Sequence, residues 1–142
     1  MTENVRFALV SDIPITVEEC VVAVTGAESG AVVTFSGVVR NHDEGRDVLT
    51  LDYTGHPSAG LVMQQVTDAV AADFPTVTIA VAHRVGSLVV GDIALACAVA
   101  SAHRSDAFAA CARLIDAIKE SVPIWKEQGF GDGSSEWVAS LG

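Results

Sequence analysis

Three runs of small and β-branched apolar residues constrain the fold of this chain more than any other feature. They span Gly30–Arg40, Val77–Val85 and Ile93–Ala102. The run Gly30–Arg40 is apolar on both faces, which is typical of a buried strand, whereas a half-exposed strand alternates apolar and polar residues. All three are far shorter than the roughly 20 residues of a membrane-spanning helix. We therefore expect a strand in each run, and a buried one at Gly30–Arg40 and at Ile93–Ala102.

Helical patterns separate these runs. Thr16 suits an N-cap, because Glu19 follows at the capping-box spacing, and that helix is expected to end near Val24. Longer helices are expected over about Ser58–Asp73 and Ser105–Glu120, each with one apolar stripe. Further strands are expected at Arg6–Val10, Val48–Tyr53, Ile124–Lys126 and Glu136–Ala139. We expect a turn or mobile loop at Asn41–Gly45, a connecting turn at Gly86–Asp92 and a glycine-rich loop around Gly129, Gly131 and Gly133. The order β-α-β-β-α-β-β-α-β-β predicts an α+β fold and a single domain over residues 1–142.

The charge balance excludes one broad class of function. The chain has 18 acidic residues against 8 lysines and arginines, a formal net charge of −10. Such a surface repels phosphate backbones, so we do not expect a general nucleic-acid-binding protein. A compact basic pocket within an acidic surface remains compatible with this balance, which makes the positions of the basic residues informative.

Cysteine use and the start of the chain indicate the compartment. Cys20, Cys97 and Cys111 are odd in number, lack CxxC spacing and have apolar neighbours, so buried thiols are expected rather than disulfides or a zinc site. Residues 1–6 are polar and no apolar signal segment follows them. We expect a soluble cytoplasmic protein that makes no contact with membranes.

The chain has only two lysines, Lys119 and Lys126, on either side of Pro123. At 100° per residue, Lys119 falls at the edge of the apolar stripe of its helix, so we expect it to be half-buried. Desolvation of an amine in such a place is a property that a catalytic lysine uses. The alternatives are that Lys119 only complements the helix dipole and that Lys126 is a solvated lysine beside Trp125.

Arginines and histidines gather where strands are expected to end. Arg40, Arg84 and Arg104 each follow an apolar run. His103 and Arg104 also directly precede the last long helix, where unpaired backbone N–H groups favour anions such as phosphate. The alternative is an ordinary ion pair with one of the many acids, and for His83 and Arg84 we favour a structural role.

Four segments resemble one known family. They are GAVVTFSGVVRNH (30–42), HRVG (83–86), SAHRSDAF (101–108) and KESVPIWK (119–126). In this order and separation they are similar to the catalytic, or large, subunit of molybdopterin synthase, the MoaE family. The similarity extends from about Gly30 to Trp137, which is most of the chain.

The resemblance implies an α/β hammerhead fold with a mixed or antiparallel sheet, and a central homodimer within a heterotetramer. Each end would bind a small ubiquitin-like sulfur carrier whose C-terminal Gly-Gly enters the pocket as a thiocarboxylate. The activity implied is that of a sulfurtransferase, which converts cyclic pyranopterin monophosphate to molybdopterin during molybdenum cofactor biosynthesis. Since this step precedes the arrival of molybdenum, no bound metal or cofactor is expected.

The resemblance also implies residue roles. Lys119 matches the essential lysine of the family, for which we favour proton transfer and positioning of the carrier tail. Lys126 matches a second active-site lysine, for which we favour anchoring an anion. The positions that match binding of the pterin and its phosphate, or the pocket near the incoming tail, are Arg40, His103, Arg104 and Phe35.

Three departures from the family pattern concern this site. Val38 stands where many relatives have a lysine, Glu127-Gln128 replaces a pattern of a basic residue followed by Glu, and the chain stops soon after Trp137.

Two other functions stay open. One is a non-catalytic dimeric module that docks a ubiquitin-like partner, and the other is an unrelated phosphate-metabolite enzyme that uses Lys119 in Schiff-base chemistry.

Overall fold

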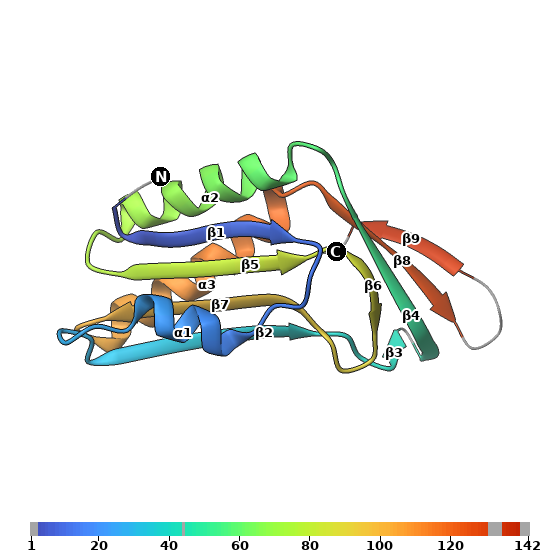
Figure 1. Ribbon diagram of the computed structural model, residues 1–142, viewed down its shortest axis with the longest axis horizontal. Coiled ribbons are helices and arrows are strands. Elements are labelled where there is room, and N and C mark those ends of the chain that lie inside the picture. The colour runs from blue at the N-terminus through green and yellow to red at the C-terminus, as the bar shows by residue number, and fades with distance from the viewer. Residues whose placement is uncertain (1–2, 44, 131–134, 140–142) are drawn as a thin grey trace.

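The structure of the chain, a computed structural model, describes residues 3–43, 45–130 and 135–139. Within these ranges the chain forms nine strands and three helices (Figure 1). No helix in the described part is both long and apolar enough to cross a membrane. The elements are β1 (Val5–Ser11), α1 (Val17–Val24), β2 (Ala31–Val38), β3 (His42–Asp43), β4 (Arg46–Gly55), α2 (Ala59–Asp73), β5 (Thr78–Arg84), β6 (Gly86–Val89), β7 (Ile93–Ser101), α3 (Arg104–Ser121), β8 (Ile124–Phe130) and β9 (Ser135–Ala139).

The main sheet has four strands in the order β1-β5-β7-β2. β1 runs parallel to β5, whereas β7 runs antiparallel to both of its neighbours, β5 and β2. α1 covers one face of this sheet, and α2 and α3 cover the other (Figure 1). The sheet is therefore mixed and enclosed between helices, which is why its central strands are apolar on both faces.

Alternating side chains of the central strands build two separate cores. Ile79 and Val81 point to the α2 and α3 side, where larger apolar residues dominate. Ala80 and Ala82 point to α1, and the facing residues of β7 are also alanines. Small side chains on this face let the short helix α1 approach the sheet closely.

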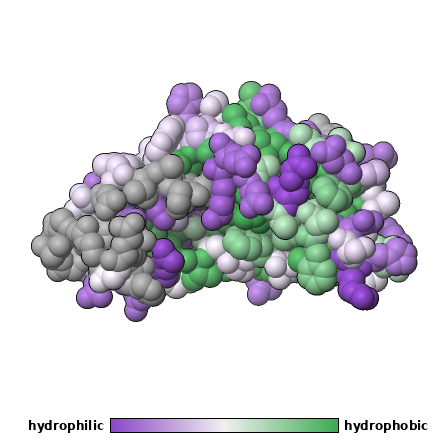
Figure 2. Space-filling view, turned by 180° about the vertical axis from the view of Figure 1, so that it is seen from behind, coloured by the Kyte–Doolittle hydropathy of each residue, from purple (hydrophilic) through white to green (hydrophobic). Residues whose placement is uncertain are grey.

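The helix α3 lies behind the main sheet in Figure 1, and Figure 2 views the molecule from that side. Hydrophilic side chains cover much of this surface, but apolar ones remain visible between them (Figure 2). The exposed large apolar residues of the two helices on this side of the sheet include Leu61 of α2 and Phe108 of α3, which are 63% and 59% exposed. The molecule therefore keeps apolar surface on the helices that cover this face.

A second sheet runs across the end of the main sheet (Figure 1). Its strands are ordered β3-β4-β8-β9. β6 also pairs with β4, along the edge of β4 that does not face β8. β6 begins at Gly86, whose φ of 106° lies in the left-handed region that glycine adopts without strain. The chain passes from the main sheet to the second sheet at this residue, directly after β5.

The predicted α+β class and the ten predicted helices and strands are confirmed. At α1 the Thr16 hydroxyl accepts a hydrogen bond from the Glu19 amide at 3.1 Å, so the predicted N-cap is also confirmed. Two predicted turns were wrong in part, because Gly86–Val89 forms β6 and the short strand β3 lies within 41–45. Both strands form by pairing with β4. β3 has only two residues and β6 has a single buried one, Leu88, so neither segment is long or apolar enough to show an alternating pattern in the sequence. β8 also continues beyond Lys126.

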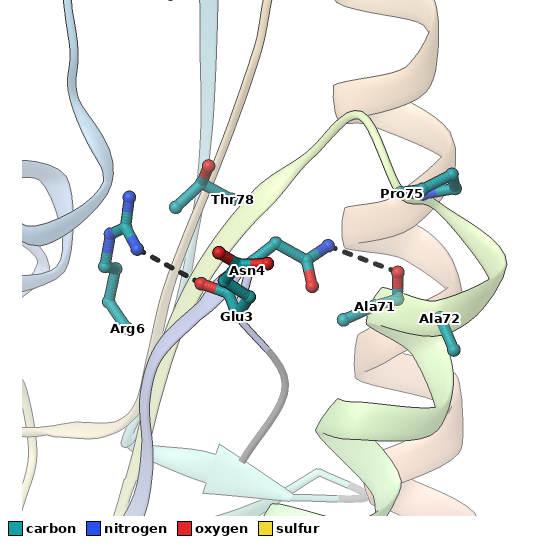
Figure 3. A pocket seen from close by; sticks show the side chains of 7 residues that line it. All are labelled: Glu3, Asn4, Arg6, Ala71, Ala72, Pro75 and Thr78. Atoms are coloured by element: carbon teal, nitrogen blue, oxygen red, sulfur yellow. Dashed lines mark hydrogen bonds between the residues drawn. The ribbon is translucent and has the colours of Figure 1, made fainter.

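The side chain of Asn4 ties the start of the chain to the end of α2. Its Nδ2 lies 3.2 Å from the carbonyl oxygen of Ala71 (Figure 3). The same nitrogen lies 3.3 and 2.9 Å from the carbonyl oxygens of Phe74 and Val77. Its own carbonyl accepts a hydrogen bond from the Ile79 amide at 2.9 Å. The carbonyls of Ala71 and Phe74 also accept backbone hydrogen bonds from the amides of Phe74 and Val77, at 3.2 and 3.1 Å. The Asn4 amide therefore adds side-chain hydrogen bonds to a turn that the backbone already closes, and it links this turn to the start of the chain.

We expect Asn4→Ala to lower the free energy of unfolding by about 1–3 kcal/mol, because it removes part-buried hydrogen bonds between the start of the chain and the segment that ends α2. Urea unfolding followed by circular dichroism measures the change. Arg6→Ala is the control, since Arg6 lines the same hollow and its hydrogen bond to the carbonyl of Glu3 is exposed (Figure 3). The control should change stability by less than about 0.5 kcal/mol. Equal losses in the two variants would contradict the role given to Asn4.

Candidate functional site

Lys126 lies on the face of the second sheet that packs against the rest of the molecule. The register places it directly opposite Tyr53, and places Gln128 opposite Leu51. Directly opposed residues share a face, and Leu51, Tyr53 and Gln128 are all buried. The neighbouring Trp125 points to the outer face and is 43% exposed. Lys126 is therefore half-buried and separated from Trp125 by the sheet, contrary to the solvated alternative.

Two buried aromatic rings, those of Tyr53 and His83, lie in contact on the same side of the second sheet as Lys126. The rings of Tyr53 and His83 lie 5.3 Å apart between centroids at 71°, an edge-to-face contact. Nδ1 of His83 donates to the carbonyl of Arg84 at 2.8 Å, since a carbonyl oxygen only accepts. Burial lowers the pKa of His83 and raises the pKa of Tyr53. Both side chains are therefore neutral near pH 7.

Lys119 lies in the last turn of α3, and its side chain is exposed. The apolar stripe is as predicted, since Ile115 and Ile118 are buried, but the expected half-burial of Lys119 was wrong. Helical side chains lean towards the N-terminus and cover the preceding turn, so no following turn covers a residue at the end of the helix. The position does suit a favourable interaction with the helix dipole.

A short, buried connection holds the two lysines at the same end of the molecule. α3 ends at Ser121 and β8 starts at Ile124. Val122 and Ile124 are 5% and 2% exposed, and the carbonyl of Pro123 accepts a hydrogen bond from the His56 amide at 2.9 Å. The segment between the lysines is therefore fixed by burial and by a bond to the loop that precedes α2.

Arg40 and Phe35 belong to β2 and its end. Arg40 is exposed just beyond the strand, at the edge of the main sheet where β5 also ends. Phe35 faces α3, is half-buried and packs against the core. A Cβ added at Gly37 would lie 3.5 Å from Cε1 of Phe35, so the ring leans along the strand towards Arg40.

His103 and Arg104 lie at the opposite edge of the main sheet. Ser101 at the end of β7 pairs with Ala31 at the start of β2. The side chains of His103, the N-cap of α3, and Arg104, its first residue, are exposed. From there α3 returns along the sheet (Figure 1). Fifteen residues separate Arg104 from Lys119, which is about 22 Å along a helix. One chain therefore brings Arg40 and the lysines to one end and leaves His103 and Arg104 at the other.

Arg84 has a structural role, as predicted. Its Nη1 lies 3.4 Å from Oδ2 of Asp92, and the same oxygen accepts a hydrogen bond from the Val89 amide at 3.0 Å. The Arg84 side chain is 17% exposed and the Asp92 side chain is 35% exposed, so the pair is only partly shielded from water. This ion pair closes the turn between β6 and β7.

The departures from the family pattern lie in different surroundings. Val38 is 53% exposed on β2, whereas Gln128 is buried on the face of Lys126. Glu127 points to the outer face, opposite Asp52. The glycines at 131 and 133 and the end of the chain beyond Ala139 lie outside the described residues.

The described residues do not assemble a metal site. Cys20, Cys97 and Cys111 are buried free thiols, as predicted. Burial, with a smaller effect of Glu19, raises the pKa of Cys20 to about 11, so this thiol stays protonated. Among the side chains that the structure describes, no group of three or more His, Cys, Asp and Glu could hold an ion.

Tyr53 and His83 are the residues of this region that sequence patterns did not single out. Tyr53 was predicted only as an apolar position of an alternating strand, and His83 only as part of a structural pair. A signal for Tyr53 was its polar hydroxyl at a position predicted to be buried. Their contact joins β4 to β5, so no local pattern reveals it.

Profile, sequence and structure comparisons lead to one family. The profile described as MoaE protein matches residues 10–121. The molybdopterin synthase catalytic subunit of Nostoc sp. is 40% identical over 128 residues, which cover 89% of this chain and 78% of that protein. Molybdopterin synthase catalytic subunit 1 of Mycobacterium tuberculosis is 36% identical over 133 residues, 93% and 90% of the two chains. The X-ray crystal structure of molybdopterin synthase from Staphylococcus aureus matches with a TM-score of 0.86 at 33% identity, over 97% of this chain and 98% of that one.

The buried His83 predicts a pH dependence of stability. Its pKa in the folded chain is lowered from 6.5, so the unfolded chain binds more protons as the pH falls below that value. The free energy of unfolding should therefore fall on acidification, by up to about 1.4 kcal/mol per pH unit from this group. Urea unfolding at about pH 7.5 and about pH 5.5 tests this against His83→Asn, which should lose this part of the dependence. An identical pH dependence in both proteins would contradict it.

Proposed function

Because this chain belongs to the MoaE family, we propose that it is the catalytic subunit of a molybdopterin synthase and transfers sulfur to a pterin. The donor is the thiocarboxylated C-terminal Gly-Gly of a small ubiquitin-like carrier. The acceptor is cyclic pyranopterin monophosphate, and two transfers give molybdopterin for molybdenum cofactor biosynthesis. The family match over residues 10–121 and the names of relatives at 36–40% identity support this proposal.

The proposed assembly is a heterotetramer, with a homodimer of this chain at the centre and one carrier at each end. The relatives are named as subunits, which supports a partner of a different kind.

Three buried free thiols suit a reducing compartment, so the proposed location is the cytoplasm.

The observation that carries the proposal is the placement of the two lysines. A thiocarboxylate and a phosphate are both anions, and a chain with a net charge of −10 repels them. Lys119 and Lys126 are the only lysines, and the buried connection keeps both at one end of the molecule. Positive charge at that end gives anionic reactants a favourable place to meet.

The two lysines have different surroundings, which supports different roles. Lys119 is exposed at the end of α3, where its amine can reach an incoming chain end and exchange a proton. Lys126 is half-buried in the sheet, so its stem has less freedom and its ammonium suits the anchoring of an anion. Phe35 would provide an apolar wall near the carrier tail.

A second copy of the chain would complete the set of anion-binding residues. His103 and Arg104 lie about one helix length from Lys119 within one chain, too far to bind the same small molecule. A two-fold axis that places α3 or β2 of two copies antiparallel brings the start of one α3 near the end of the other. The exposed Phe108 on α3 and Val32 on β2 offer apolar surface for such a contact.

We expect Lys119→Ala to reduce the conversion of the pterin at least about a hundredfold, because it removes a group that transfers protons. The assay uses purified thiocarboxylated carrier and measures molybdopterin formed. Arg113→Ala on the same helix is the control, since the ion pair of Arg113 with Asp73 at 3.7 Å is exposed. A wild-type rate for Lys119→Ala would leave the chain as a docking module.

Mixing two inactive variants tests whether the site is shared. A dimer of one Lys119→Ala copy and one Arg104→Ala copy has one intact site if the site lies between copies, and none if it lies within a copy. Random exchange should then restore about a quarter of the wild-type activity, because half of the dimers are mixed and each has one of two sites. No recovery, after mass spectrometry has shown mixed dimers, would place the site within a single copy or remove Arg104 from it.

A further inference from the structure

The half-buried Lys126 lies against an aromatic side chain to which the proposed function assigns no role. Tyr53 is directly opposite it on β4. Directly opposed Cβ atoms in an antiparallel ladder are about 4.5–5.5 Å apart. Tyr53 is 8% exposed, so its ring lies on the buried inner face of the sheet, the face that it shares with Lys126. A lysine stem packed on an apolar ring keeps its charged head at the border of that surface.

Tyr53 is held in turn by a residue of the other sheet. His83 ends β5 and is 1% exposed, and the two rings meet edge to face at 5.3 Å. Its ring has little freedom to turn, because Nδ1 donates to the carbonyl of Arg84 at 2.8 Å. Arg84 is bound to Asp92. The ring contact of His83 with Tyr53, and the pairing of Tyr53 with Lys126 across the ladder, therefore link the main sheet to Lys126.

The two rings bring no charge to this place. Burial keeps the imidazole of His83 unprotonated and the phenol of Tyr53 protonated near pH 7, since it lowers the pKa of the first and raises the pKa of the second. The pair neither repels the ammonium of Lys126 as a second cation would, nor neutralises it as a carboxylate would. Its contribution is shape, which fixes the direction of the lysine without reducing its charge.

We propose that Tyr53 and His83 are positioning residues that direct the ammonium of Lys126 towards the anionic reactant. The identity of the reactant rests on the proposed function, whereas the placement of the lysine does not. His83 holds the ring of Tyr53, and the ring limits the paths that the lysine stem can take. The hydroxyl of Tyr53 is not part of the inference.

The presence of only two lysines allows a direct test. Brief acetylation followed by mass spectrometry reports the labelling rate of Lys126 with Lys119 as an internal reference. In Tyr53→Leu, Lys126 should be labelled faster relative to Lys119, and kcat/KM for the pterin should fall about tenfold. Tyr53→Phe keeps the ring, and Thr54→Leu places the same new residue on the outer face of the same strand. Both should stay within about twofold of wild type.

His83→Asn is the second variant, and it tests the same inference if Tyr53→Leu fails to fold. Its side-chain amide can still donate to the carbonyl of Arg84, but the ring edge that meets Tyr53 is removed. It should raise the labelling of Lys126 relative to Lys119 in the same direction. Unchanged labelling in both variants, or an equal rise at both lysines, would overturn the inference. A different result would overturn the proposed function alone: the variants raise the labelling of Lys126 relative to Lys119, but the wild-type protein forms no molybdopterin.

Discussion

The placement of every candidate residue depends on β7, which is hydrogen-bonded to neighbours on both sides and buried from Ala94 to Ser101. Because β2 and β5 both run antiparallel to it, their ends share one edge of the main sheet and the end of β7 forms the other. α3 starts at this second edge and returns to the first. The direction of one strand thus separates His103 and Arg104 from the lysines, which is the reason that the proposed site draws on a second copy of the chain.

The pairing of β4 with β8 has a comparable influence on the lysine environment. A slip of one residue would exchange the faces of Lys126 and Trp125, since strand side chains alternate. The observed register buries Leu51 and Tyr53, which favours it over the slipped one. It also places Gly129 opposite Thr50, where an added Cβ would collide with the threonine hydroxyl. A side chain at 129 therefore conflicts with the arrangement that buries the stem of Lys126.

Charge and rigidity at the lysine end of the molecule come from different residues. An acidic surface keeps anions away from most of the molecule, and the exposed Lys119 and the half-buried Lys126 provide cationic groups at one end. Rigidity has a different source. The buried segment at Val122–Ile124 and the neutral pair of Tyr53 and His83 hold the backbone and the stem of Lys126 without adding charge. Position and charge at this end are thus supplied by different residues.

The sequence by itself determined the α+β class, the three helices, the N-cap at Thr16, the buried central strands and the family, because these follow from patterns within short segments. It also determined the candidate residues, although not their arrangement. Only the tertiary structure decided that Lys119 is exposed, that Lys126 shares a face with Tyr53, and that His103 lies at the far edge. β6 was likewise missed, since its pairing with β4 has no local pattern. The physical reason is that periodicity reports which residues of a segment avoid water, whereas strand direction and register arise from contacts between segments far apart in the chain.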